Sequence, residues 1–385
     1  MTKRKICVVV TARPSYARVR TMLHAIQMHE SLELQLVLAG SALLDKYGDV
    51  GPIAEKDGFV ISERIYNLLS GAAPTSMAKT TGLAIMELAT AFQNLKPDIV
   101  VTIADRFETI ATSIAASYQN IPLAHIQGGE VTGSIDEKVR HANTKFADLH
   151  LVASELAKQR VLKMGEHAAS ILNTGCPSMD IARAVIESPA IDFDPTQKYG
   201  GVGAEIAPKG QYIVVMQHAV TTEDTHARKQ IEETIRAVNA LDMPTFWFWP
   251  NADLGGESIS SGLRHHREEY DLHKTRFFKN MEPEDFLRLV KNSACLIGNS
   301  SVGIRECAFL GVPVVNIGSR QTSRERGQNV VDCGHDADEI KAQILKQIAH
   351  GHYASEPIYG DGHAGKKAAD ALANFVLKFH KTLAY

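Results

Sequence analysis

The sequence lacks the features that mark secreted, membrane and nucleic-acid-binding proteins. Its 385 residues include only five cysteines and no Cys-x-x-Cys pair, which argues against a disulfide framework or a zinc site. No apolar run approaches the ~18–20 residues that span a bilayer, and the run after Lys3-Arg4-Lys5 is only as long as a strand. The net charge is -3, without a basic stretch. We therefore expect a soluble cytoplasmic protein that binds neither membranes nor nucleic acid.

Two further absences concern small ligands. The first apolar strand, Ile6–Val10, leads into Thr11-Ala12-Arg13-Pro14 and not into the Gly-x-Gly-x-x-Gly turn of dinucleotide-binding proteins. None of the 16 histidines shows metal-ligand spacing with carboxylates, except in pairs that a single helix explains. We therefore expect no cofactor and no metal.

What the sequence does contain is an alternation of buried strands and helices in both halves. The predicted strands are 34–38, 99–103, 123–126, 149–152 and 171–174, then 212–216, 245–249, 275–278, 295–297 and 314–317. Such alternation is typical of parallel sheets covered by helices on both faces. Residues 47–79 are rich in Gly, Pro and Ser and are predicted to be loop with short helices, whereas the Gly- and Pro-rich segment 188–210 has the composition of a linker.

We therefore predict an α/β fold with two Rossmann-like domains facing a cleft. The expected domains are residues 1–188, residues 189–364, and a C-terminal helix within 365–385 that crosses back to the first domain. Helices are also expected at 107–118, 155–164, 224–240, 258–270, 283–290 and 302–309, and from 365 to 380.

The densest group of acids and bases lies at 125–146, where a strand meets two glycines, Glu130 and a helical pattern. Ser134 with Glu137 fits a capping box, and Asp136 with Arg140, like Glu137 with His141, is spaced to share a helix face. When each of these residues is taken alone, a cap or a surface pair is the better explanation. Glu130 has no such structural role, so the stretch favours proton-transfer chemistry near a sugar or anionic ligand.

Polar residues also follow other predicted strands, where open α/β sheets bind ligands. Asp105 either caps the next helix or belongs to the site, and Arg13 either reaches a phosphate or lies on the surface. His218 is a structural or a functional histidine. Ser300 and Ser301 open a helix, where they cap it, bind phosphate, or do both. The last of these turns holds Arg320, which is expected beside the same phosphate.

Together these turns resemble the UDP-N-acetylglucosamine 2-epimerase family, and in particular its hydrolysing branch, over nearly the whole chain. The resemblance is carried by 13–15, 105–108, 125–141, 217–218, 298–306 and 318–321. It implies the GT-B fold of two Rossmann domains, which agrees with the architecture predicted above. It also implies elimination of UDP from UDP-N-acetylglucosamine to give 2-acetamidoglucal, followed by hydration to N-acetylmannosamine, as in sialic acid-type sugar biosynthesis. A homodimer or higher homo-oligomer is the expected assembly, with the UDP-sugar and UDP as its small-molecule partners.

The resemblance assigns the residues as follows. The catalytic candidates are Asp105, Gln127, Glu130, Asp136, Glu137 and His218. The substrate-binding candidates are Arg13, Ser15, Arg106, Arg140, Asn251, Ser300, Ser301, Glu306 and Arg320, with Glu306 as acceptor for a ribose hydroxyl.

One position departs from the family pattern. Many members carry a catalytic glutamate where this chain has Gln127 in the run His-Ile-Gln-Gly-Gly-Glu. A neutral amide cannot act as a base, so either Glu130 takes the proton or Gln127 only orients the sugar. A modified substrate, UDP-N,N′-diacetylbacillosamine of the legionaminic acid route, is an alternative. Three other readings remain: a non-hydrolysing epimerase, a GT-B glycosyltransferase and a catalytically inactive nucleotide-sugar sensor.

Overall fold

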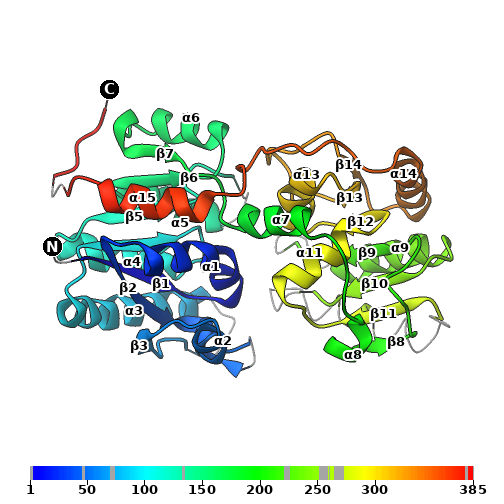
Figure 1. Ribbon diagram of the computed structural model, residues 1–385, viewed down its shortest axis with the longest axis horizontal. Helices are drawn as coiled ribbons and strands as arrows, with labels where there is room; N and C mark the ends of the chain where they lie inside the picture. The colour runs from blue at the N-terminus through cyan, green and yellow to red at the C-terminus, as the bar shows by residue number, and fades with distance from the viewer. Residues whose placement is uncertain are drawn as a thin grey trace. The chain divides into compact units, whose positions relative to one another are not determined.

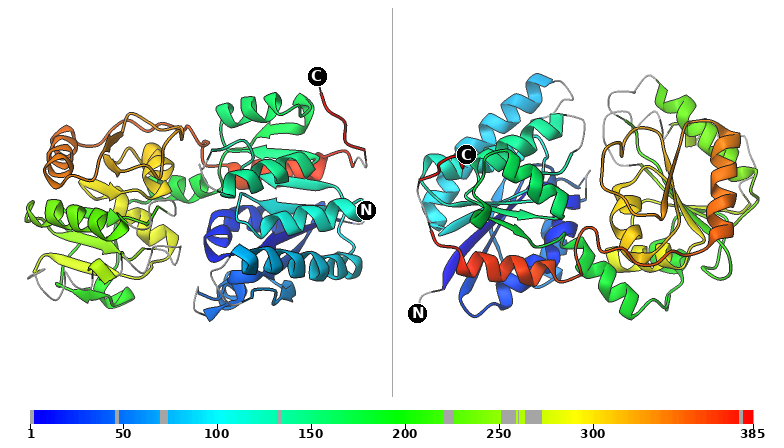
Figure 2. Two further views of the ribbon diagram at one scale, coloured as in Figure 1. Left: turned by 180° about the vertical axis from the view of Figure 1, so that it is seen from behind. Right: turned by 90° about the horizontal axis from the view of Figure 1, so that it is seen from above.

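The computed structural model describes residues 3–45, 48–69, 74–131, 135–220, 226–250, 259, 261–263, 273–377 and 380–384. The chain divides into two compact units, of which unit 1 comprises residues 1–180 and 359–385 and unit 2 comprises residues 181–358. Each unit holds a seven-stranded sheet with helices on both faces, as Figures 1 and 2 show. The predicted α/β class with two Rossmann-like domains is therefore confirmed.

Unit 1 has an all-parallel sheet in the order β3-β2-β1-β4-β5-β6-β7. Its strands are β1 (Arg4–Val10), β2 (Leu32–Ala39), β3 (Ile61–Ile65), β4 (Ile99–Ile103), β5 (Leu123–Ile126), β6 (Leu149–Val152) and β7 (Ile171–Asn173). Its helices are α1 (Arg13–Met28), α2 (Gly51–Lys56), α3 (Pro74–Leu95), α4 (Thr109–Tyr118), α5 (Ile135–Phe146), α6 (Glu155–Lys163) and α15 (Ala364–Asn374), with short 3-10 turns at Gly40–Leu43 and Ala168–Ser170.

Strand β1 shows why this sheet needs two helical layers. Its side chains alternate between the faces, and both sets are apolar and buried. Ile6 and Val8 pack with residues of α1 and α15, whereas Cys7 and Val9 pack with residues of α3 and α4. Burial on both faces is what the continuous β-branched run predicts.

Two predictions for unit 1 were wrong. The segment expected to be loop contains β3, which pairs with β2 at the edge of the sheet, and also the start of α3. The C-terminal helix ends at Asn374 and not at His380, because Phe375 is extended and the Arg4 guanidinium donates to the carbonyls of Leu372, Ala373 and Phe375. These bonds satisfy carbonyls that a longer helix would have used. Helix α15 lies against α1, which places it in unit 1 as expected.

Unit 2 has the order β14-β13-β12-β9-β10-β11-β8, parallel except for β8. Its strands are β8 (Val202–Gly203), β9 (Ile213–Met216), β10 (Thr245–Phe248), β11 (Thr275–Phe278), β12 (Cys295–Gly298), β13 (Val314–Ile317) and β14 (Val330–Cys333). Its helices are α8 (Pro195–Tyr199), α9 (Ala227–Asn239), α11 (Pro283–Lys291), α12 (Ser301–Ile304), α13 (Glu306–Leu310) and α14 (Ala337–His350), and α7 (Ser178–Glu187) spans the division between the units.

The predicted linker belongs to unit 2. Its residues form α8 and the edge strand β8, and Lys198 and Tyr199 both donate to the buried Asp285 carboxylate at 2.6 Å. The predicted helix 302–309 is in fact two short helices that meet at Arg305. Most of the predicted helix 258–270 lies outside the described residues. Among the helices that the structure describes, none has the length and apolar character to cross a membrane.

Candidate active site

Each sheet has a topological switch point, where the strand order reverses and open α/β sheets bind ligands. In unit 1 the switch point lies between β1 and β4, and in unit 2 between β9 and β12. The predicted site residues follow these strands or their immediate neighbours. Two of the turns at this edge of unit 1 place a non-glycine residue in the left-handed region, with φ of 56° at Ala104 and 64° at Gln127. Such conformations are costly and are often found at functional sites.

Asp105, directly after β4, is held by Arg140 of α5. The Arg140 guanidinium donates to the Asp105 carboxylate and, at 2.6 Å, to the main-chain oxygen of Gln127. Arg140 is 1% exposed, so its charge is buried against the aspartate. The sequence left Asp105 as a helix cap or a site residue; α4 begins after Glu108 without a side-chain cap, and the structure gives Asp105 the ion pair. Arg140 therefore fixes two strand-end turns to one helix.

Gln127 is completely buried. Its side-chain oxygen accepts a hydrogen bond from Arg18 at 3.0 Å, and its amide nitrogen donates to the Cys176 sulfur at 2.9 Å. Both ends of the amide are thus engaged, and its orientation follows from its partners, because the arginine can only donate. The Gln127 side chain therefore links Arg18 to Cys176 through two hydrogen bonds.

His125, near the end of β5, connects the Ala104 turn to helix α5. One ring nitrogen lies 2.9 Å from the main-chain oxygen of Ala104, and the other lies 3.1 Å from the Thr144 hydroxyl on α5. Burial lowers the pKa of His125 to about 3, so the ring is neutral near pH 7. One of its nitrogens then donates and the other accepts. His125 therefore supports the Ala104 turn.

The remaining acidic candidates lie on the turn and at the start of α5. Glu130 is 5% exposed. Asp136 and Glu137 occupy the first turn of α5, where carboxylates interact favourably with the helix dipole. Glu137 lies 3.4 Å from His141, so that predicted pair is present. Ser134, the other half of the predicted capping box, lies outside the described residues.

Three predicted substrate-binding residues flank this group in unit 1. Arg13 is the first residue of α1, and its guanidinium lies so close to Gly48 that a side chain there would clash with it. Ser15, on the same helix, is buried. Arg106 is about one third exposed, and its Nε donates at 2.7 Å to the buried Glu108 carboxylate. Glu108 therefore orients Arg106 while leaving part of its guanidinium accessible.

At the switch point of unit 2 the central pair is formed by uncharged groups. The main-chain nitrogen of His218, after β9, donates to the Asn299 side chain at 2.7 Å, and the Asn299 amide returns a bond to the His218 carbonyl at 2.9 Å. Burial, with an added contribution from the charge of Arg320, lowers the pKa of His218 to about 3. His218 is therefore a neutral ring near pH 7, suited to hydrogen bonding.

The predicted phosphate loop lies beside this pair. Ser300 caps α12 by accepting from Val302, Ser301 is the first residue of α12, and Glu306 is the first residue of α13. Arg320 donates to the main-chain oxygen of Asn299 at 3.2 Å. Hydroxyls, a carboxylate and a guanidinium are thus gathered around the end of β12. Asn251, the remaining predicted ligand, lies outside the described residues.

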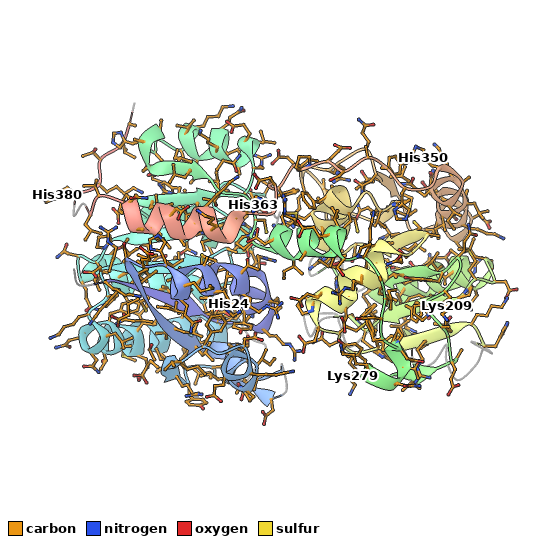
Figure 3. The ribbon with its side chains drawn as sticks, in the orientation of Figure 1. His24, Lys209, Lys279, His350, His363 and His380 are labelled. Carbon is orange, nitrogen blue, oxygen red and sulfur yellow. The ribbon has the colours of Figure 1, made fainter. Side chains whose placement is uncertain are left out.

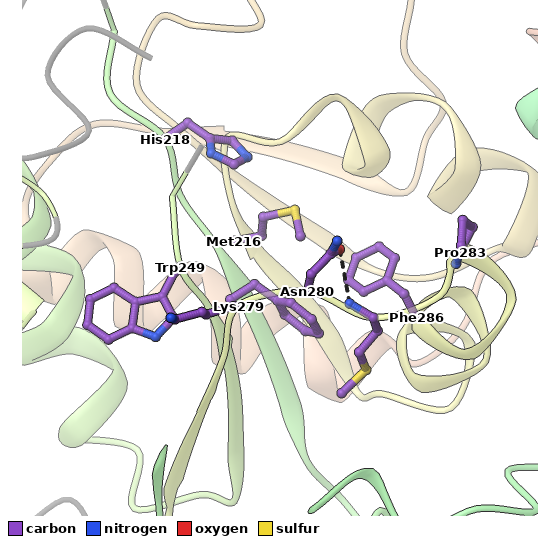
Figure 4. A pocket seen from close by; sticks show the side chains of 9 residues that line it. Met216, His218, Trp249, Lys279, Asn280, Pro283 and Phe286 are labelled. Carbon is purple, nitrogen blue, oxygen red and sulfur yellow. Dashed lines mark hydrogen bonds between the residues drawn. The ribbon is translucent and has the colours of Figure 1, made fainter. Parts of the chain in front are cut away.

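A cavity of about 200 Å³ opens next to His218 at the ends of β9, β10 and β11. Figure 4 shows Trp249 and Lys279 on one side of it and Phe286 on the other, with Asn280 between them. The Asn280 side chain accepts from the Met281 nitrogen at 3.0 Å. The cavity is lined by Met216, His218, Phe248, Trp249, Lys279, Asn280, Met281, Pro283 and Phe286. Aromatic and thioether walls with a few polar groups suit a flat heterocycle.

Sequence reasoning missed Arg18, Cys176 and this cavity. Arg18 lies on the helix that opens with Arg13, and a second arginine so near a strand end was a usable signal. Cys176 gave none, because 49 residues separate it from Gln127. The cavity depends on residues from three strand ends, whose proximity only the sheet order fixes.

Comparison with known proteins agrees with this arrangement. Residues 24–373 match the family described as UDP-N-acetylglucosamine 2-epimerase. The chain is 32% identical over 374 residues to the UDP-N,N′-diacetylbacillosamine 2-epimerase (hydrolyzing) of Legionella pneumophila, with 97% of each chain covered. It is 33% identical over 334 residues to the GDP/UDP-N,N′-diacetylbacillosamine 2-epimerase (hydrolyzing) of Campylobacter jejuni, covering 86% of this chain and 85% of that one.

Among solved structures, the UDP-GlcNAc 2-epimerase of Neisseria meningitidis bound to UDP-GlcNAc has a TM-score of 0.78 at 18% identity. The match covers 96% of this chain and 99% of that one, and at this identity it shows the shared fold. The family match runs from within α1 to within α15 and so includes residues of both units. The chain belongs to the UDP-N-acetylglucosamine 2-epimerase family.

Proposed function

We propose that this protein is a hydrolysing 2-epimerase that converts UDP-N-acetylglucosamine and water into N-acetylmannosamine and UDP. The observation that carries the proposal is the buried Arg140–Asp105 pair at the unit 1 switch point, with Glu130, Asp136 and Glu137 on the neighbouring turn and helix. The names of the Legionella and Campylobacter relatives support the hydrolysing reaction.

The reaction requires two proton transfers. In the first step a carboxylate takes the proton from C2, the electrons of that bond form the C1=C2 double bond of 2-acetamidoglucal, and UDP leaves C1 with the electrons of the C1–O bond. In the second step water supplies the hydroxyl at C1, and C2 receives a proton on the opposite face. General acid–base catalysis by positioned carboxylates contributes about 10²–10⁴-fold to such steps.

We assign this proton traffic to Asp105, Glu130, Asp136 and Glu137. Arg140 orients the Asp105 carboxylate through its hydrogen bond and packs it against the Gln127 turn. The Gln127 amide is engaged at both ends, so we assign the base role at this turn to Glu130. Gln127 then acts by holding Arg18, which together with Arg13 and Arg106 offers positive charge to the departing diphosphate.

The nucleotide side is assigned to unit 2. We assign hydrogen bonds to phosphate to a neutral His218, the hydroxyls of Ser300 and Ser301, and Arg320, and we assign Glu306 as the acceptor for a ribose hydroxyl. The cavity beside His218 is proposed as the uracil site, because its aromatic walls accept a planar ring. Asn251 remains a predicted ligand.

A second candidate substrate is UDP-N,N′-diacetylbacillosamine. It is favoured by one observation, that the Legionella and Campylobacter relatives are named for this sugar. The bond changes at C1 and C2 are the same for this sugar, so the site described above serves either substrate. The two differ in the substituents at C4 and C6.

The proposal is tested by proton NMR of the protein with UDP-N-acetylglucosamine in deuterated water. Free N-acetylmannosamine with deuterium at C2, accumulating with UDP, is the expected result. UDP-N-acetylmannosamine would instead indicate a non-hydrolysing enzyme. Turnover of UDP-N,N′-diacetylbacillosamine alone would establish the second candidate, and inactivity on both sugars would refute the proposal.

A further inference from the structure

A second group of charges lies in unit 1 at the opposite, amino-terminal edge of the sheet, below the last turn of α5. Its centre is the Glu166 carboxylate, which is 3% exposed. One carboxylate oxygen accepts from the Lys145 ammonium at 2.5 Å. The other lies 3.1 Å from the His150 ring and 2.7 Å from the Lys381 ammonium. The group thus joins α5, β6, the loop after α6 and the C-terminal segment.

These contacts leave the glutamate ionised. Burial by itself would raise the pKa of Glu166, but the hydrogen bonds from His150, Lys145 and Lys381 lower it to about 2. Burial also lowers the pKa of His150. The nearby Asp148 carboxylate accepts from the Leu123 main-chain nitrogen at 2.9 Å. Lys145 and Lys381 therefore lie near the carboxylates of Glu166 and Asp148. The Glu166 carboxylate is shared by elements that are far apart in the sequence.

Lys381 makes a further set of contacts with α5. Its ammonium donates to the main-chain oxygen of Thr144 at 3.3 Å and to that of Ala147. Carbonyls at the end of a helix lack partners within the helix, and a cation there also interacts favourably with the helix dipole. The neighbouring tail residues are fixed as well, since Thr382 lies 3.0 Å from the His167 ring and Ala384 donates to the Gly165 carbonyl at 2.9 Å.

The tail reaches this place after the end of α15. Figure 3 labels His363 just before α15 and His380 beyond it, next to Lys381 in the sequence. Segment 380–384 then lies along the loop at 165–167. The tail thereby brings the Lys381 ammonium to the carbonyls at the end of α5. Among the described contacts, no cation from α5 itself binds these carbonyls.

The other side of the same helix carries the catalytic geometry. Arg140 binds the Asp105 and Gln127 turns, and the Thr144 hydroxyl lies 3.1 Å from the His125 ring. Asn143 donates to the Thr109 hydroxyl at 2.9 Å, which fixes α5 to the start of α4. Thr144 therefore has its side chain on the catalytic network and its main-chain oxygen on Lys381.

We propose that Lys381 is a positioning residue for the reaction. Its ammonium fixes the last turn of α5 and thereby holds Arg140 and Thr144 in register with the strand-end turns that carry Asp105 and His125. The proposal rests on the proposed function where it concerns turnover. A misplacement of about 1 Å by a change far from the reacting atoms can cost on the order of 10²-fold in rate, so the effect is measurable.

A cavity beside the lysine makes the proposal testable by chemical rescue. It has a volume of about 200 Å³ and lies next to the Lys381 side chain. It is lined by Ser117, Asn120, Ile121, Pro122, Lys145, Phe146, Asp148 and Lys381. Ethylammonium has the terminal group of a lysine and is small enough to enter, so it can replace the ammonium that Lys381→Ala removes.

The experiment compares wild type with Lys381→Ala in sugar release from the substrate that wild type turns over. We expect kcat to fall about tenfold while KM stays within about twofold, and millimolar ethylammonium chloride to restore at least half of the lost kcat. Tetramethylammonium, which carries the charge without an N–H donor, should not restore it. The control is Lys366→Ala, whose lysine pairs with Asp370 at 2.7 Å on an exposed face of α15 and should leave kcat and KM unchanged.

An unchanged kcat in Lys381→Ala would overturn the proposal, even with a lowered unfolding temperature, because the tail would then act on stability alone. Loss of kcat without rescue would also count against it. Hydrogen exchange of the α5 amides, measured without substrate, separates this failure from failure of the proposed function. We expect faster exchange at 144–147 in Lys381→Ala and its reversal by ethylammonium; equal exchange in both proteins would refute the positioning role whatever the enzyme's substrate.

Discussion

At the switch point of unit 1 the buried Arg140 is paired with Asp105, whereas at the switch point of unit 2 the main chain of His218 exchanges two hydrogen bonds with the Asn299 amide. Both lie where parallel strands diverge, and the sheet order places them there in the same way. The difference lies in charge. The central pair is charged in unit 1 and uncharged in unit 2, where the charged candidates Glu306 and Arg320 lie beside it. One topology, used twice, thus fits the proposed division between chemistry in unit 1 and nucleotide binding in unit 2.

The largest effect is expected from a substitution that impairs the proposed chemistry in unit 1 and leaves UDP binding intact. Asp105→Asn keeps the shape of the side chain and removes its ability to accept a proton. We expect kcat for sugar release to fall by about 10³, while the Kd for UDP stays within about threefold, because UDP is assigned to unit 2. Steady-state kinetics and calorimetry measure the two quantities. An unimpaired kcat would remove Asp105 from the mechanism.

The next prediction compares the two arginines. Arg140→Met leaves the Asp105 carboxylate without its buried partner, and we expect a loss of about 3 kcal/mol in unfolding free energy together with a fall of about 10² in kcat. Arg320→Met is the matched change in unit 2. It should raise the Kd for UDP about tenfold, the loss expected for one charged hydrogen bond, with a small effect on stability.

Equal losses of stability in both variants would contradict the distinction between the two units. Urea unfolding and UDP titration of the same samples decide between these outcomes.

The sequence predicts the interior of each sheet better than its edges. Strands 99–103, 123–126, 149–152, 275–278 and 314–317 have the predicted bounds, because strands buried on both faces leave continuous apolar runs. Edge strand β3 reads Ile-Ser-Glu-Arg-Ile and is largely half-exposed, so its pattern resembles a loop. Its pairing with β2 comes from tertiary contact.

The candidate site was predictable as a set of strand-end turns but not as a network. Arg140 stands four residues after Asp136, and the helical spacing predicted that pair. In the structure Arg140 also reaches Asp105, 35 residues away. Local spacing cannot reveal such a pair, because it depends on how α5 packs over the ends of β4 and β5.

A third prediction uses pH, and here the two units should behave alike. In the folded protein the pKa values of His125 and His218 are lowered to about 3, whereas an unfolded histidine titrates near 6.5. The unfolded state therefore takes up protons first as the pH falls. The stability that each neutral histidine contributes is present above about pH 6.5 and is lost progressively toward pH 3.

We expect wild type to lose up to about 1.4 kcal/mol per pH unit for each of these histidines over that range. His125→Asn and His218→Asn should each flatten the dependence by about that amount, measured by urea unfolding at pH 6, 5 and 4. A variant with the wild-type slope would show that its histidine is protonated in the folded state.

The smallest expected effect separates capping from ligand binding in unit 2. Ser300→Ala removes the cap of α12, whose bond to Val302 is long at 3.4 Å, and should cost about 0.5–1 kcal/mol of stability. It should also raise the Kd for UDP by about threefold, since a hydroxyl hydrogen bond contributes about 0.5–1.5 kcal/mol.

Ser154→Ala is the matched control, because Ser154 caps α6 of unit 1 in the same way. Its stability should fall similarly while the Kd for UDP stays unchanged. A wild-type Kd in Ser300→Ala would leave Ser300 as a cap only.

The way the chain is divided has a consequence during synthesis. Unit 2 is one continuous segment, whereas unit 1 is built from residues 1–180 and 359–385. Asp180 accepts from the first amides of α15, and Arg4 binds its last carbonyls. On the ribosome, unit 1 must therefore wait with part of its apolar surface uncovered until residue 374 has been translated. Unit 2 can fold before that, so we expect unit 2 to fold first, against the usual amino-to-carboxyl order. During this interval the exposed apolar surface of unit 1 is available to chaperones.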